Sequence, residues 1–221
     1  MKLRVLSCKY TEKNTDGDFR WMLRQPQYAM SLFLYSENVV DWLTQENKGG
    51  GTACLRPFTY NAHKLMKIEC EPRAAGLPTG WSRQSRGFSR LDNLTKEAIN
   101  FAFDHIVALI RELKTIDTVI YSCAENDYDI GVNIFKGSLS DEVVSYITAR
   151  IHVLPLAMSH CDKVESIESI YEKQLKLLPY ALMCQEVAEL RHENRLLKKQ
   201  LESMPKRKRR VPVPAKLVDI E

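Results

Sequence analysis

The residues with the clearest potential for chemistry are three successive glycines in the segment GGGTA (49–53). The segment lies between two apolar stretches, AMSLFLYS (29–36) and ACLRPF (53–58). Successive backbone N–H groups in such a loop can surround an anion, and glycine lets a phosphate or a ribose come close to the backbone. The segment has neither the P-loop pattern GxxxxGK[ST] nor the dinucleotide pattern GxGxxG. By itself it is consistent with a surface turn or with an anion-binding loop.

No catalytic set can be assembled from the other reactive side chains. The five histidines are widely spaced, and no Ser/His/Asp or Cys/His arrangement emerges, so catalytic residues stay unassigned and enzymatic activity stays open. His105 lies in the middle of an expected helix and is interpreted as a packing residue. Glu125, Asp127 and Asp129 alternate as in part of a calcium loop, but the remaining ligands are missing, which favours a solvated acidic loop.

Composition and charge restrict the class of protein. Hydrophobic residues make up 44% of the 221 residues, and charged residues make up 27%, as in ordinary globular proteins. The six scattered cysteines show no zinc spacing, so we expect free thiols, no metal and no cofactor. We find no apolar run long enough to cross a bilayer and no signal-peptide pattern, and we expect a cytoplasmic protein without a membrane partner.

The net charge of +4 is concentrated near the C-terminus, in the run PKRKRR (205–210). Five basic side chains there form a candidate contact to nucleic acid, with a solvated tail as the alternative. These side chains are Lys206, Arg207, Lys208, Arg209 and Arg210.

The elements that would position a site alternate between strands and helices, which predicts an α/β fold with a largely parallel or mixed sheet. In such sheets ligands bind at the carboxyl ends of the strands. We expect strands at 1–7, 29–36, 64–70 and 118–123, helices at 94–114 and 140–154, a short helix or turn at 37–43, a short strand or helix start at 53–58, an irregular segment at 11–28 and a loop at 72–92.

The order of the motifs resembles that of macrodomain-related proteins, α/β domains that bind ADP-ribose and similar nucleotide derivatives. It is similar in particular to uncharacterised phage and bacterial proteins with this domain. The resemblance covers roughly residues 29–152, and this chain departs from it in the last loop, where Gly131 stands in place of a denser glycine pattern. The motifs are LFLYSEN (32–38), GGGTA (49–53), GLPTGWS (76–82), the helix 94–114 and VIYSC…DIGVNIF (119–135).

This resemblance implies a macrodomain-like mixed sheet flanked by helices in residues 1–155. It implies binding, sequestration or processing of a nucleotide or ADP-ribose-type ligand. Asn38 would contact a ribose or base. The phosphate would be held by Gly49, Gly50, Gly51 and Thr52.

Five further residues would complete the pocket by the same resemblance. Thr79 would lie at its wall, and Asp129 and Gly131 would close the opposite side. Trp81 would stack on a base or serve as a hydrophobic plug, and Arg56 would pair with phosphate or serve a structural role.

The C-terminal part has a different pattern. We expect a connecting helix at 156–178, a coiled-coil helix at 179–204 and a basic, disordered tail at 205–221. Heptad positions a and d are taken by Val187, Leu190, Asn194, Leu197 and Leu201.

A single Asn at position a is typical of parallel two-stranded coiled coils. Glu186 and Glu193 at position g face Arg191 and Lys198 at position e of a second helix. The pattern predicts a parallel homodimer, with a helix packed on its own domain as the alternative. A second hypothesis for the whole chain is a non-enzymatic dimeric interaction protein that contacts nucleic acid or a host protein through its basic tail.

Overall fold

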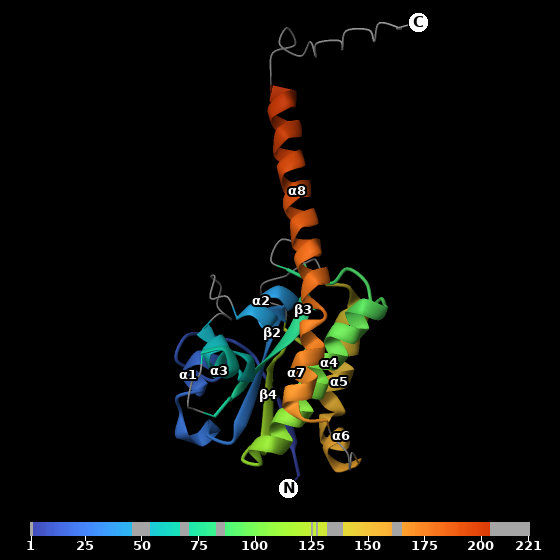
Figure 1. Ribbon diagram of the computed structural model, residues 1–221. Coiled ribbons are helices and arrows are strands. Elements are labelled where there is room, and N and C mark those ends of the chain that lie inside the picture. The colour runs from blue at the N-terminus through green and yellow to red at the C-terminus, as the bar shows by residue number, and fades with distance from the viewer. Residues whose placement is uncertain are drawn as a thin grey trace, which may run out of the picture.

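The computed structural model describes residues 2–45, 54–66, 71–82, 87–124, 126, 128–131, 139–160 and 165–203. Within them four strands form one parallel sheet in the order β1-β4-β2-β3. Helices cover both faces of this sheet, so the body is a three-layer α/β unit (Figure 1). The predicted α/β class is confirmed, and the described part of the sheet is wholly parallel. The strands are β1 (Arg4–Cys8), β2 (Ser31–Asn38), β3 (Ala74–Gly80) and β4 (Thr118–Ser122).

The remaining elements connect these strands or follow them. They are α1 (Phe19–Met22), η1 (Pro26–Tyr28), α2 (Val39–Thr44), η3 (Arg56–Phe58), α3 (Tyr60–Met66), α4 (Asn93–Leu113), α5 (Asp141–His152), α6 (Leu154–His160), α7 (Ile167–Leu175) and α8 (Leu178–Ser203).

One face of the sheet packs against α4 and its neighbours α5 and α7. Side chains alternate along a strand, so Leu32 and Leu34 of β2 point to this face and join the larger core cluster. The helix α4 supplies the longest apolar stripe of that cluster and begins where Asp92 accepts a hydrogen bond from the N–H of Thr95 at 2.9 Å. The predicted helix at 94–114 and the predicted strands that became β2 and β4 are confirmed.

The opposite face is covered by the long connection from β1 to β2, which includes α1 and η1. Phe33 of β2 packs on Phe19 of α1, with ring centroids 5.1 Å apart, and on Tyr28 of η1 at 6.2 Å. Asp18 caps α1 by accepting hydrogen bonds from the backbone N–H groups of Arg20 and Trp21. The segment 11–28, expected to be irregular, is therefore a folded excursion that packs on the sheet.

Two sequence predictions are wrong. The segment 64–70 was expected to be a strand, but Lys64–Met66 end α3; residues 67–70 lie outside the described residues. The segment 72–92 was expected to be loop, but Ala74–Gly80 form β3. Small residues make up most of this strand, and at Gly76 the neighbours leave little space: a Cβ there would lie 3.2 Å from atoms of Glu37 and Trp42. Within the described sheet β3 is an edge strand, where a proline is tolerated.

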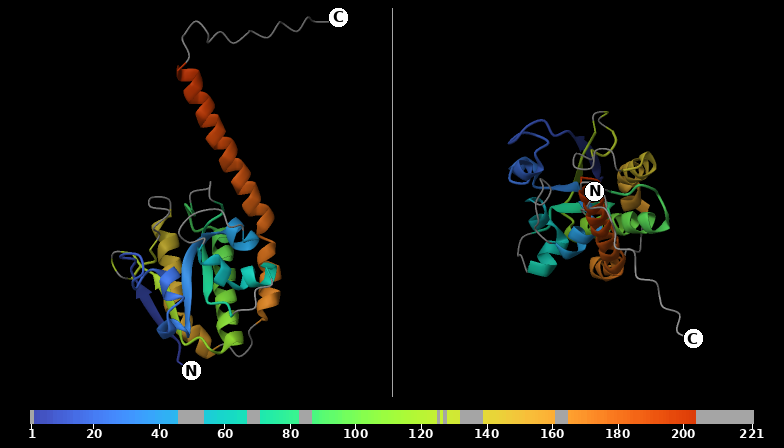
Figure 2. Two further views of the ribbon diagram at one scale, coloured as in Figure 1. Left: turned by 90° about the vertical axis from the view of Figure 1, so that its left-hand side faces the viewer. Right: turned by 90° about the horizontal axis from the view of Figure 1, so that it is seen from above.

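The C-terminal helices divide between the body and an extension. The segment expected to be one connecting helix contains α7 and most of α6, and α7 contributes Ile167 and Ile170 to the larger core cluster. The helix α8 starts on the body beside α2, and its C-terminal part projects well beyond it (Figures 1 and 2). Of the described helices, none is both long and apolar enough to cross a membrane.

Candidate functional site

A cavity lies between the β1–β2 excursion and the carboxyl ends of β2 and β4. It encloses about 510 Å³, within the usual range for small-molecule sites. Ser36 of β2, Ser122 of β4 and Gly131 form its sheet side. The chain leaves β1 toward the α1 face and leaves β4 toward the α5 face. Such divergence at the carboxyl ends of parallel strands is where α/β sheets bind ligands.

The excursion side of the cavity is basic. Lys13, Arg20 and Arg24 line it, and none of the three forms an ion pair with a described residue. One acidic side chain among the described residues, Asp18, also lines the cavity, and its carboxylate is engaged in capping α1. The charges around the cavity therefore favour an anion. Trp21, half-buried at the same wall, offers an aromatic surface.

Tyr35 is the most informative residue of this cavity. Its side chain is 3% exposed and lines the cavity, and its hydroxyl has no hydrogen-bond partner in the part of the chain that the structure describes. Burial, followed by the negative charge of Glu37, raises the pKa of Tyr35 well above its ordinary value. The hydroxyl therefore stays protonated at neutral pH and is available to donate a hydrogen bond. A buried, unpartnered hydroxyl is costly unless something else satisfies it.

Cys54 also lines the cavity. It is the first described residue after residues 46–53, the glycine segment, which contains GGGTA (49–53). Burial is the main cause that raises the pKa of the Cys54 thiol, although the charges of Arg20 and Arg24 oppose the effect. A thiol with a raised pKa is a poor nucleophile at neutral pH. The cavity thus has features for binding an anion, and its described side chains do not form a nucleophile–base pair.

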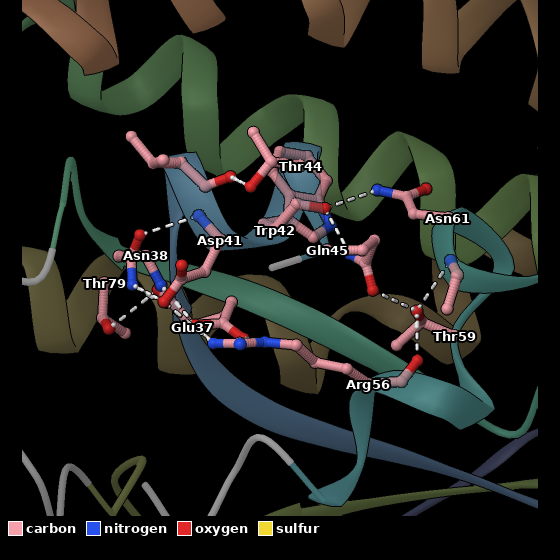
Figure 3. Close-up of polar contacts among 12 residues, drawn as sticks. Glu37, Asn38, Asp41, Trp42, Thr44, Gln45, Arg56, Thr59, Asn61 and Thr79 are labelled. Carbon is pink, nitrogen blue, oxygen red and sulfur yellow. Dashed lines mark hydrogen bonds and ion pairs between the residues drawn. The ribbon is translucent and has the colours of Figure 1, made fainter. Parts of the chain in front are cut away.

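A second polar cluster lies close by, at the ends of β2 and β3 (Figure 3), and its side chains are buried. Arg56 binds Glu37 through two hydrogen bonds, Nε to Oε2 at 2.5 Å and Nη2 to Oε1 at 2.9 Å. The same Nη2 donates to Oδ2 of Asp41 at 2.9 Å. Asn38 joins the cluster by donating from Nδ2 to Asp41 at 2.8 Å. Each of these four side chains is at most 7% exposed.

Burial and pairing act in opposite directions inside this cluster. Burial raises the pKa of Glu37, and the hydrogen bond and charge of Arg56 oppose this without cancelling it. Burial alone would lower the pKa of Arg56, but the bonds and charges of Glu37 and Asp41 raise it. Arg56 therefore remains a cation that neutralises buried carboxylates.

The cluster also holds the described ends of the glycine segment. Gln45, the last described residue before it, is 3% exposed and donates from Nε2 to the carbonyl of Trp42 at 2.5 Å. Its Oε1 accepts from the hydroxyl of Thr59 at 3.0 Å, and Asn61 donates to the same Trp42 carbonyl at 2.9 Å. The network thereby joins α2 to α3 across the segment (Figure 3).

The structure brings some of the predicted ligand residues together and separates others. Asn38, Arg56 and Thr79 meet in the buried cluster, where the Thr79 hydroxyl donates to the Glu37 carbonyl at 3.2 Å. Trp81 lies elsewhere, between Phe88 at 5.1 Å and Tyr180 of α8 at 4.7 Å, in the position of a hydrophobic plug.

The remaining predicted residues divide between the cavity and the undescribed segments. Gly131 lines the cavity, in the loop that follows β4. Asp129 accepts a hydrogen bond from Asn126 at 2.6 Å and does not line it. The residues Gly49, Gly50, Gly51 and Thr52, and the basic residues Lys206, Arg207, Lys208, Arg209 and Arg210, lie outside the described residues.

Sequence reasoning missed the cationic wall and the carboxylates of the cluster. Lys13, Arg20 and Arg24 belong to a polar segment whose position depends on packing against β2, so no local pattern indicated them. Two signals were present in β2: an acid, Glu37, in a strand that is buried along most of its length, and a tyrosine, Tyr35, whose polar tip must find a partner when buried.

Two further results concern metal sites and similar proteins. Among the described residues no group of three or more His, Cys, Asp or Glu side chains is placed to hold a metal ion. No protein-family model, no curated protein and no solved structure matches the chain.

Proposed function

We propose that the α/β unit is a macrodomain-like module that binds a phosphate-bearing nucleotide derivative of the ADP-ribose type in the cavity between the β1–β2 excursion and the sheet. The observation that carries this proposal is the buried Tyr35 hydroxyl, which has no hydrogen-bond partner among the described residues and lines a cavity with three cations that form no ion pair with those residues. A phosphate would accept from that hydroxyl and neutralise Lys13, Arg20 and Arg24.

The position of the cavity supports the same class of ligand. It lies at the carboxyl ends of parallel strands, the usual place for nucleotides in α/β sheets. Cys54 at its wall follows directly on GGGTA (49–53), the segment whose backbone N–H groups suit an anion. Trp21 offers a surface on which a base can stack. The volume of about 510 Å³ accommodates a nucleotide.

This placement changes the roles of the predicted residues. Arg56 and Asn38 would act at a distance, by holding the flanks of the glycine segment, and not by contact with the ligand. Gly131 keeps a place at the cavity wall, where a Cβ would lie 2.4 Å from the carbonyl oxygen of Cys123. The proposed function is binding of the ligand. Sequestration of the ligand would need no residues beyond those that bind it.

Isothermal titration calorimetry of the full chain tests the proposal. The panel consists of ADP-ribose, NAD, cyclic nucleotides and inorganic phosphate, against wild type and Arg20→Ala/Arg24→Ala. We expect heat with at least one nucleotide derivative and a loss of about tenfold or more in affinity in the double variant. Arg4→Ala, at the start of β1 and outside the cavity lining, is the matched control. If the folded wild type gives no heat with any compound, the proposal fails.

The alternative hypothesis of a basic-tail contact to nucleic acid stays a prediction, because residues 205–210 lie outside the described structure. It predicts salt-dependent binding of DNA or RNA that disappears when residues 205–221 are removed. Equal binding by the truncated chain would remove its mechanism.

A further inference from the structure

From Met183 onward, the apolar heptad positions of α8 are exposed. Near its start, Ala181 is fully buried against the core, while Met183, Val187 and Leu190 are 40–51% exposed. At about 100° per residue, these three lie on the side of the helix roughly opposite Ala181. Packing of α8 on its own domain is therefore seen at Tyr180, which contacts Trp81, and at Ala181, whereas the side chains of Met183, Val187 and Leu190 are exposed.

The same stripe continues along the projecting part of α8, where the described body no longer accompanies the helix (Figure 2). Leu197 and Leu201 are 55% and 56% exposed, and Asn194 lies between them and Val187 on the same side. The steps along the stripe alternate between three and four residues, which is the spacing of a two-helix seam. Within the described residues nothing covers this stripe.

Charges on the two flanks of the stripe have opposite signs. On one flank, a groove of about 810 Å³ runs between α8 and the segment that carries Trp81. The charged side chains that line this groove are all basic: Arg90, Arg191, Arg195 and Lys198. On the other flank the charged side chains between 186 and 193 are acidic, namely Glu186, Glu189 and Glu193.

We infer that a second copy of this chain docks along α8 as a parallel two-helix coiled coil, with the acidic flank of each helix against the basic groove of the other. Glu186 then faces the partner's Arg191, and Glu193 faces the partner's Lys198. Each Asn194 meets its equivalent on the two-fold axis. The groove beside Trp81 is one half of this interface.

The charge pattern selects the parallel arrangement. In an antiparallel pair, positions e would face e and positions g would face g. Arg191 and Lys198 would then lie against basic residues, and Glu186 and Glu193 against acidic ones. In the parallel pair all four e–g contacts are attractive. The same asymmetry argues for a second copy over an unrelated helix, because the two flanks complement each other.

Sedimentation equilibrium of the full chain over a concentration series is the first test. We expect a species of twice 25.5 kDa. Two charge-reversed chains are then compared, Glu186→Lys/Glu193→Lys and Arg191→Glu/Lys198→Glu. Each alone places like charges at all four e–g contacts, so its dissociation constant should rise by at least about tenfold. An equimolar mixture should restore a dimer with one copy of each.

Each outcome of these measurements either supports or overturns the proposed dimer. A chain with all four substitutions regains complementary flanks and should dimerise like wild type, which separates charge pairing from damage to the helix. Circular dichroism confirms that each variant is folded. A wild type that remains monomeric overturns the inference. So does a dimer that both charge-reversed chains form as tightly as wild type, because the interface would then lie elsewhere. Neither result bears on the ligand cavity, since the two sites share no residue.

Discussion

Arg56 binds Glu37 with both ends of its guanidinium fork, at 2.5 Å and 2.9 Å, although the two side chains are each 3% exposed. Replacing Arg56 by Met would leave Glu37 and Asp41 buried without their cation. Removal of one partner from a buried ion pair costs about 3–5 kcal/mol. We expect the free energy of unfolding, measured by urea titration, to fall by about that amount in Arg56→Met.

The exposed pair of Arg4 with Asp117 is the control. Its atoms are 3.4 Å apart, and the Arg4 side chain is 63% exposed. Solvent screening makes such a pair worth about 1 kcal/mol or less. Adding Glu37→Gln to Arg56→Met should recover part of the lost stability, because one buried charge disappears. Equal effects at Arg56 and Arg4 would contradict the structural role assigned to the cluster.

A second prediction concerns the close approach of two backbone segments at the end of β3. A Cβ on Gly80 would lie 2.7 Å from Cα of Gly87 and 2.9 Å from its nitrogen. Backbone atoms cannot move aside without shifting the strand, so Gly80→Ala should lower the free energy of unfolding by about 2 kcal/mol or more. At Gly76 the nearest atoms are side-chain atoms of Glu37 and Trp42 at 3.2 Å, so Gly76→Ala should cost less. The reverse order in thermal unfolding would contradict this packing.

The elements that the sequence predicted correctly are those with strong local patterns. The helix α4 carries an apolar stripe over 21 residues and a capping Asp92, and β2 and β4 are apolar runs of strand length. The strand β3 was not predicted from the sequence, because its small residues fit against side chains that are distant in the sequence. At Gly76 these are Glu37 and Trp42. Local preference gives no hint of such a contact.

The candidate site was predictable only in outline. The carboxyl ends of the strands were predicted to be the ligand-binding edge, and a cavity lined by Gly131 lies there. The cations Lys13, Arg20 and Arg24 were not found, because packing of Phe19 on Phe33 brings their segment over the sheet. Arg56 was given two possible roles, and pairing with Glu37 and Asp41 shows the structural one. The ligand itself stays a prediction.

His105 gives a third prediction, about stability and pH. It is 4% exposed in α4, between Trp42 and Tyr60 at ring-centroid distances of 6.4 Å and 5.4 Å. Burial lowers the pKa of His105 from 6.5 to about 4. Between these values the unfolded chain binds a proton that the folded chain does not, so stability is present above pH 6.5 and is lost as the pH falls toward 4.

The loss attributable to His105 is up to about 3 kcal/mol, since one pKa unit corresponds to about 1.4 kcal/mol. Urea titrations of wild type and His105→Leu at pH 7, 6, 5 and 4 measure it by difference. Other groups, including Glu37 with its raised pKa, contribute to both chains and cancel. The expected result is a gap between the two proteins that changes by this amount toward low pH. A constant gap would mean that His105 titrates normally in the folded state.

A fourth prediction follows from the proposed parallel pairing of α8. Asn194 places a polar amide in the apolar seam, which weakens association but favours one register. Asn194→Leu should lower the dissociation constant of self-association, measured by sedimentation equilibrium, about tenfold. The reason is that dimerisation then desolvates no amide. Asn194→Leu should also permit antiparallel or higher assemblies, which cross-linking through Leu201→Cys detects. His192→Leu, at an outer heptad position, is the control and should leave association unchanged. Weaker association of Asn194→Leu would exclude it from the seam.

The last prediction separates the two roles of Tyr35. Its hydroxyl is buried and has no hydrogen-bond partner among the described residues, so Tyr35→Phe removes a polar group that makes no hydrogen bond to this part of the fold. The free energy of unfolding without ligand should stay the same or rise by about 1 kcal/mol. The affinity for the nucleotide derivative should fall about tenfold, because a hydrogen bond to a charged phosphate is worth about 1.5–3 kcal/mol.

Tyr146→Phe provides the matched control, since the Tyr146 hydroxyl donates to Asn100 at 2.8 Å on the opposite side of the sheet. That variant should lose about 1 kcal/mol of stability and bind the ligand normally. Urea titration and calorimetry on the same preparations distinguish the two cases. If Tyr35→Phe behaves like Tyr146→Phe, the Tyr35 hydroxyl serves the fold. If Tyr35→Phe gains stability and loses affinity, the Tyr35 hydroxyl serves to bind the ligand.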